Sequence, residues 1–180
     1  MLAGHVQFGF DANNTLWASA GGPQSGAAGW INVKLLEETG DEAKSQGWTP
    51  FILDTNGNGK RDEYTEPNQP LDPAKDRRIN VAFYGVSPSR DGTVWGTSLG
   101  YPGYVVRLDP TKPNPSETAL AEVYEVPAPA YGPRGMKLPE RRAVDVRSQR
   151  TSCPRAALQT GCAGISVRGN RQQRSCHRQA

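Results

Sequence analysis

The hydrophobic positions of residues 1–136 occur in short runs that end at turn-forming residues. The segment FGFDANNTLWASAGG (Phe8 to Gly22) reads as an aromatic run, an Asp/Asn turn and a second apolar run. Residues 83–100, FYGVSPSRDGTVWGTSLG, repeat this order with a turn predicted to be two residues longer. Asn-Asn and Asp-Gly accept the positive φ angles of tight turns, and β-branched or aromatic residues suit paired strands. Each segment therefore predicts a β-hairpin, with Thr15-Leu16-Trp17 aligned on Thr93-Val94-Trp95.

Further strands are predicted downstream. YVVRL (104–108) is an apolar strand that ends at Asp109-Pro110, and AEVYEVP (121–127) alternates apolar and acidic residues as a half-buried strand does. YGPRGM (131–136) is similar to the start of another turn-strand unit. One helical candidate, residues 31–47, is divided by Gly40 into short pieces. The pattern indicates a mainly β fold.

Composition supports short strands and many turns. The 180 residues include 20 Gly and 15 Pro, more than long helices tolerate. No run of eighteen or more apolar residues is present, so we expect no membrane span. The start, MLAGHVQFGF, lacks the basic and apolar regions of a signal peptide, so we expect no signal peptide in this chain.

Charge and aromatic residues divide the chain near Met136. Residues 137–180 carry nine Arg and one Lys against Glu140 and Asp145, so the formal net charge of +3 divides into +8 here and −5 in residues 1–136. All fourteen aromatic residues lie in 1–136. We interpret 137–180 as a basic tail that is disordered or that comes from a shifted reading frame. Without aromatic side chains for base stacking, the tail predicts no nucleic-acid partner.

The residues DGTVWGTSLGYPGYVVRLDP (91–110) resemble the blade motif of streptogramin-lyase-like (virginiamycin B lyase-like) and NHL-type β-propellers. FDANNTLWASAGG resembles a second copy, and the block from Gly40 to Gly92 resembles a group of exported bacterial proteins built on that blade. The similarity covers about residues 4–136. It implies a partial β-propeller-like array of antiparallel hairpins, with two to three blades, in a full-length protein that is periplasmic or secreted. A propeller needs about four or more blades, so we expect this chain to be a fragment.

The loop DTNGNGKRDE has the spacing of a calcium site. Calcium loops place oxygen ligands at positions 1, 3, 5, 7 and 9 and a glycine at position 6, which is Gly59 here. Position 12, normally a bidentate glutamate, is Thr65, and both Glu63 and Glu66 are near enough to substitute. The alternative is a polar Asn-Gly turn with solvated charges. We predict a structural calcium site, flanked by strands, whose ligands are Asp54, Asn56, Asn58, Lys60 through its backbone carbonyl, Asp62 and Glu63.

Other candidate chemistry is sparse. Streptogramin-type lyases use a histidine and a divalent cation, but His5 does not stand in the corresponding blade context, and the remaining histidine is His177. The spacings of Cys153, Cys162 and Cys176 fit no zinc or disulfide framework. We predict no catalytic residue in the chain.

Two functions remain open. The first is a non-catalytic binding or structural role, with an unknown ligand, in an exported propeller-like protein stabilised by calcium. The alternative is part of a streptogramin-lyase-like carbon–oxygen lyase whose active site lies in missing blades. Trp17 and Trp95 are expected in the core of the blades, whereas Trp30 and Trp48 flank the helical candidate. Open sheet edges are expected to make the isolated chain self-associate.

Overall fold

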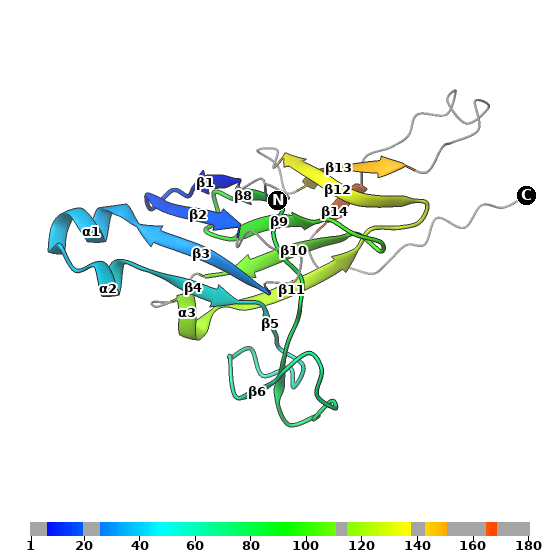
Figure 1. The fold of residues 1–180 in the computed structure, drawn as a ribbon, viewed down its shortest axis with the longest axis horizontal. Coiled ribbons are helices and arrows are strands. Elements are labelled where there is room, and N and C mark those ends of the chain that lie inside the picture. Colours follow the sequence, from blue (N-terminus) through cyan, green and yellow to red (C-terminus); the bar gives the residue numbers. More distant parts are fainter. Residues whose placement is uncertain (1–6, 20–25, 111–114, 138–142, 151–164, 169–180) are drawn as a thin grey trace, which may run out of the picture.

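The computed structural model describes residues 7–19, 26–110, 115–137, 143–150 and 165–168. These residues form three sheets, shown in Figure 1, and three short helices. The prediction of a mainly β fold is confirmed, and the described strands form no closed barrel or propeller. No helix among these residues has the length and apolar character needed to cross a membrane.

The first sheet is a four-stranded antiparallel meander in which each strand pairs with the next along the chain. Two helices, α1 (Val33–Thr39) and α2 (Glu42–Ser45), connect its third strand to its fourth. Gly40 ends α1 with a φ of 67°, which confirms the predicted division of the helical segment. The four strands are β1 (Phe8–Phe10), β2 (Thr15–Ser19), β3 (Ala27–Asn32) and β4 (Gln46–Pro50).

The second sheet contains another four-stranded antiparallel meander, β8 to β11. Short strands from the preceding segment extend it beyond β11: β5 pairs with β11 in parallel, and β7 and β6 follow, in the order β6-β7-β5-β11-β10-β9-β8. Helix α3 (Pro115–Thr118) precedes β11. The strands are β5 (Ile52–Leu53), β6 (Tyr64–Thr65), β7 (Asp76–Arg78), β8 (Gly85–Pro88), β9 (Val94–Ser98), β10 (Tyr104–Asp109) and β11 (Leu120–Glu125).

Equivalent backbone hydrogen bonds close the turns of the two predicted hairpins. Asp11 N donates to the Thr15 carbonyl at 3.0 Å, and Ser89 N donates to the Thr93 carbonyl at 2.8 Å. The residue before each threonine has a positive φ, 61° at Asn14 and 85° at Gly92. The predicted alignment of the two segments is therefore confirmed. The prediction of a longer second turn is wrong, because the additional residues of that segment lie before β8.

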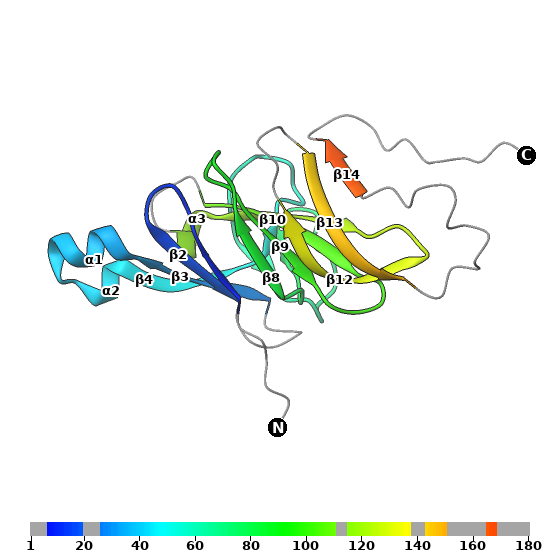
Figure 2. The same ribbon diagram turned by 90° about the horizontal axis from the view of Figure 1, so that it is seen from above.

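A shared hydrophobic core joins the first two sheets. Trp17 is 1% exposed and Trp30 is 8% exposed, and both belong to one buried cluster with residues of β9, β10 and β11. Phe51 and Phe83 meet at the centre, with ring centroids 4.7 Å apart. The core comprises Trp17, Ala28, Trp30, Phe51, Phe83, Val94, Val106, Leu108, Ala119 and Ala121. Figure 2 shows the strands of the two sheets side by side, with β2 next to β8.

Trp95 belongs to a smaller cluster on the other side of the second sheet. It is half-buried and stacks on Tyr124 with centroids 6.0 Å apart, near Val105 and Val126. Both tryptophans predicted to pack in the core therefore lie on strands and contact hydrophobic residues. Trp48 differs, since 61% of its surface is exposed on β4.

The third sheet consists of β12 (Ala130–Lys137), β13 (Ala143–Arg150) and β14 (Ile165–Arg168). The last two strands lie in the segment that composition predicts to be disordered, so the structure differs from that expectation at these two places. The physical reason is a local alternation, AVDV at the start of β13 and ISV in β14, that supports extended pairing without aromatic residues. The other residues of 138–180 lie outside the described part of the chain.

Candidate metal site

The predicted calcium loop lies in the connection between β5 and β7. This connection lies at the bottom of Figure 1 and includes the short strand β6, the edge strand of the second sheet. β5 places Asp54 at the start of the loop, and the parallel pairing of β6 with β7 holds its far end. The loop is thus flanked by strands, as predicted.

Asp54 organises the first half of the loop. Its Oδ1 accepts hydrogen bonds from Gly57 N at 2.7 Å and Asn58 N at 3.2 Å, and its Oδ2 accepts one from Gly59 N at 2.8 Å. The chain can curl around this carboxylate because both glycines adopt left-handed φ angles, 77° and 71°. A carboxylate at position 1 is therefore fixed in place by the backbone that follows it.

The two asparagines continue the same curl. Asn56 Oδ1 accepts a hydrogen bond from Asn58 N at 3.1 Å, and Asn58 Oδ1 accepts one from Lys60 N at 2.8 Å. Each carbonyl oxygen has two lone pairs, so an oxygen that accepts one N–H can also coordinate a cation. The side-chain oxygens at positions 1, 3 and 5 thus each accept a backbone N–H from a residue that follows them in the loop.

Asp62, at position 9, faces these asparagines. Its Oδ2 accepts hydrogen bonds from Asn58 Nδ2 and from Asn56 Nδ2, the latter at 3.3 Å. The bonds from Asn58 and Asn56 hold the pKa of Asp62 below its usual value. The carboxylate is therefore negatively charged at neutral pH and faces the amide nitrogens of both asparagines.

Glu63 and Glu66 are directed to other partners. Glu63 forms an ion pair with Lys75 at 2.9 Å, and the hydrogen bond and charge of that lysine lower the pKa of Glu63. Glu66 forms an ion pair with Arg78 at 3.2 Å. Lys60 is exposed and donates its backbone N–H within the loop. Of the predicted side-chain ligands, the structure brings together Asp54, Asn56, Asn58 and Asp62, and it places Glu63 in a separate ion pair.

One acidic residue beside the loop was not predicted from the sequence. Asp76 on β7 is fully buried, and its Oδ2 accepts a hydrogen bond from Asp62 N at 2.8 Å. Its Oδ1 is buried without a hydrogen-bond partner. No motif spacing could have identified it, because it reaches the loop only through the pairing of β6 with β7. In the part of the chain that is described, no three Asp, Glu, His or Cys side chains converge as a preformed metal site.

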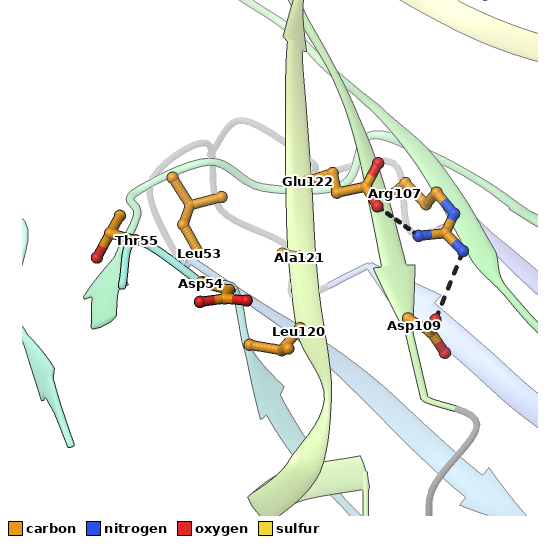
Figure 3. Close-up of a pocket in the computed structure, with 8 residues that line it drawn as sticks. All are labelled: Leu53, Asp54, Thr55, Arg107, Asp109, Leu120, Ala121 and Glu122. Atoms are coloured by element: carbon orange, nitrogen blue, oxygen red, sulfur yellow. Dashed lines mark hydrogen bonds and ion pairs between the residues drawn. The ribbon is translucent and has the colours of Figure 1, made fainter. Parts of the chain in front are cut away.

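A groove adjoins the loop. Its volume is about 480 Å³, and it lies over β5, β10 and β11 (Figure 3). Arg107 spans one side and contacts Glu122 at 2.6 Å and Asp109 at 3.5 Å. Asp54 belongs to both the groove and the calcium loop. The groove is lined by Leu53, Asp54, Thr55, Arg107, Asp109, Leu120, Ala121 and Glu122.

The remaining candidates of the sequence interpretation lie outside the described residues. These are both histidines and all three cysteines: His5, Cys153, Cys162, Cys176 and His177.

Trp30, which the sequence placed beside the helical candidate, donates its Nε1–H to Ser116 Oγ at 3.0 Å and so joins β3 to α3.

Comparison with known proteins adds no relative: no family model matches the chain, and neither the curated proteins nor the solved structures contain a match. The resemblance to streptogramin-lyase-like and NHL-type propellers therefore stays a prediction.

Proposed function

We propose that this chain is a non-catalytic binding or structural module of an exported, propeller-like protein, and that calcium stabilises its loop from Asp54 to Glu63. The observation that carries the calcium proposal is the arrangement of side-chain oxygens in the loop. The side-chain oxygens of Asp54, Asn56 and Asn58 each accept a backbone N–H of the loop, which holds them in place. Asp62 adds a second carboxylate, which accepts hydrogen bonds from the amide nitrogens of Asn56 and Asn58.

The oxygen set suits calcium among the common metals. Ca²⁺ prefers carboxylate and carbonyl oxygens in an adaptable arrangement, whereas zinc prefers nitrogen and sulfur. Two carboxylates and two amides give a modest negative charge, which corresponds to a Kd of about 10⁻⁴–10⁻³ M, typical of extracellular modules. Such an affinity fits an exported protein.

The two four-stranded meanders support the propeller-like architecture. Propeller blades are four-stranded antiparallel sheets arranged around a centre. Here β1–β4 and β8–β11 have the same strand order, share one core and begin with equivalent hairpins. The groove beside Asp54 supplies a place for a ligand, with apolar Leu53 and Leu120 next to charged groups.

Thermal unfolding in calcium and in chelator tests the calcium proposal. At about 10 mM Ca²⁺ and a Kd of 10⁻⁴–10⁻³ M, binding to the folded state adds about 1.4–2.7 kcal/mol. For a chain of this size, that raises Tm by about 3–10 °C. Asp54→Ala should abolish the increase.

Asp72→Asn is the matched control, because Asp72 lies in the same connection and its Oδ1 accepts a hydrogen bond from Ala74 N, outside the oxygen set. This variant should keep the calcium response. An equal Tm of the wild-type chain in calcium and in chelator would refute the site.

A further inference from the structure

Asp76 is a buried carboxylate with one oxygen unsatisfied. The residue is fully buried, Oδ2 accepts the N–H of Asp62 at 2.8 Å, and Oδ1 has no hydrogen-bond partner. Removing a charged oxygen from water without a partner is costly, so such an atom in a native fold calls for a bound water or ion. This buried oxygen therefore indicates a ligand at this point.

The backbone holds Asp76 against the end of the calcium loop. Asp76 N donates to the Glu63 carbonyl at 2.9 Å, and Asp76 stands opposite Tyr64 in the parallel pairing of β6 and β7. Thr65 Oγ1 donates to the Asp76 carbonyl. The carboxylate thus approaches the loop at Asp62, where the ninth loop position lies.

A cationic side chain near Asp76 is directed to other partners. Arg61 interacts electrostatically with Asp76, but its guanidinium donates to the Ser116 carbonyl at 2.6 Å and lies 5.7 Å from the centre of the Tyr64 ring. Asp76 Oδ1 keeps no hydrogen-bond partner. Asp76 therefore offers a third carboxylate, besides those of Asp54 and Asp62, to a cation at the loop.

We propose that Asp76 is a calcium ligand through Oδ1, and that it supplies from β7 the carboxylate that the loop lacks at its twelfth position, where Thr65 stands. This inference rests on the proposed calcium function of the loop. It adds a ligand outside the linear motif, so that the ion would join the loop to β7.

An ion would replace hydrogen bonds that Asp62 now accepts within the loop. The amide nitrogens of Asn56 and Asn58 donate to Asp62. A cation would take their place as the partner of Asp62 and draw the carboxylates together.

Calcium titration by calorimetry separates this inference from the proposed function. The wild-type chain and Asp72→Asn should bind Ca²⁺ equally, whereas Asp76→Asn should bind at least about ten-fold more weakly. Asn is isosteric with Asp, and its Oδ1 can still accept the Asp62 N–H. If the wild-type chain does not bind calcium, the proposed function and this inference both fail. If Asp76→Asn binds like the wild-type chain, this inference alone fails.

Stability distinguishes a ligand from a structural group. In chelator, Asp76→Asn should be at least as stable as the wild-type chain, because it removes an unpaired buried charge. In saturating calcium the order should reverse. A lower Tm of the variant in both solutions would overturn the inference.

A direct measurement decides the matter if Asp76→Asn does not fold. In a crystal structure of the wild-type chain with Ca²⁺, Asp76 Oδ1 should lie about 2.3–2.6 Å from the ion, the usual calcium–oxygen distance. An ion held by the loop with Asp76 Oδ1 outside its coordination shell would refute the proposal.

Discussion

The ring of Phe83 lies directly over the backbone of Gly96, so closely that a β-carbon on Gly96 would be 2.0 Å from Phe83 Cδ1. The same ring packs on Phe51 in the core shared by the first two sheets. The absence of a side chain at Gly96 therefore allows the loop that precedes β8 to lie on β9. The contact joins residues from segments that the sequence pattern treats as separate units.

Gly96→Ala should destabilise the fold by about 2–3 kcal/mol, because the new methyl group forces the Phe83 ring out of a packed core. Urea denaturation measures the change in the free energy of unfolding. Gly135→Ala in β12 is the control, since a β-carbon there meets nothing within 4 Å, and its effect should stay below about 0.5 kcal/mol. Equal stability of the two variants would contradict the close contact.

Asp11→Ala should lower the free energy of unfolding by about 1–3 kcal/mol. Asp11 accepts hydrogen bonds from the backbone N–H of Asn13 and Thr15, and its Oδ2 accepts one from the buried Trp17 Nε1 at 3.0 Å. Loss of the carboxylate leaves that indole N–H unsatisfied, which is the costly part. Asn13→Ala changes an exposed side chain of the same turn and should be nearly neutral.

A double-mutant cycle tests the indole bond itself. Trp17→Phe removes the N–H, so adding Asp11→Ala to it should cost clearly less than Asp11→Ala costs in the wild-type chain. Additive effects of the two substitutions would show that the Asp11–Trp17 hydrogen bond contributes nothing.

Tyr124 predicts a loss of stability at alkaline pH. Its burial, together with its hydrogen bond to Glu122 and the negative charge of that residue, raises the pKa of Tyr124 to about 12. The folded state then holds the phenol proton more tightly than the unfolded chain, whose tyrosine pKa is about 10. The stability that the protonated Tyr124 contributes to the folded state is fully present below pH ~10 and is lost as the pH rises through ~12.

Urea denaturation between pH 9 and 12 measures this dependence. Tyr124→Phe should show a smaller fall in stability across that interval than the wild-type chain. Tyr101→Phe serves as the control, because Tyr101 is 79% exposed, and it should follow the wild-type curve. Identical slopes for all three proteins would contradict the raised pKa.

Self-association is expected through the exposed aromatic residues of β1. Phe8 and Phe10 are 67% and 55% exposed on the edge strand of the first sheet. An edge with exposed aromatic side chains favours pairing with another chain, and charged residues oppose it. Sedimentation velocity should show concentration-dependent association, which Phe10→Lys reduces. A wild-type chain that is monomeric at every concentration would refute this prediction.

Local signals allowed the turns of the two hairpins and about half of the strands to be predicted, among them β1, β2, β8, β9, β10 and β11. Asn14 and Gly92 adopt the positive φ angles that their residue types favour, and Gly40 divides the helical segment where the sequence indicates. The hydrogen bonds from backbone N–H groups to the side-chain oxygens of Asp54, Asn56 and Asn58 are likewise local to the loop. These features depend on neighbours within a few residues of each other.

Features that depend on distant pairing could not be predicted. Asp76 contacts Asp62 across fourteen residues, through a parallel pairing of two very short strands that leave no periodic pattern. The closeness of Phe83 to Gly96 likewise depends on how the segment before β8 folds onto β9. The strand β13 was not predicted, because the basic composition of residues 137–180 indicated disorder. The short alternation of apolar residues at the start of this strand was a weaker signal.

Asp54 belongs at once to the calcium loop and to the wall of the groove over β10 and β11. Two occupants that share a residue influence each other's affinity, and by thermodynamic reciprocity the influence is equal in both directions. A molecule bound in the groove would therefore change the affinity of the loop for calcium by a certain factor. Calcium would change the affinity of the groove for that molecule by the same factor. If the chain is exported and its loop binds calcium, as proposed, the calcium concentration of the surroundings would then set how strongly the groove is filled.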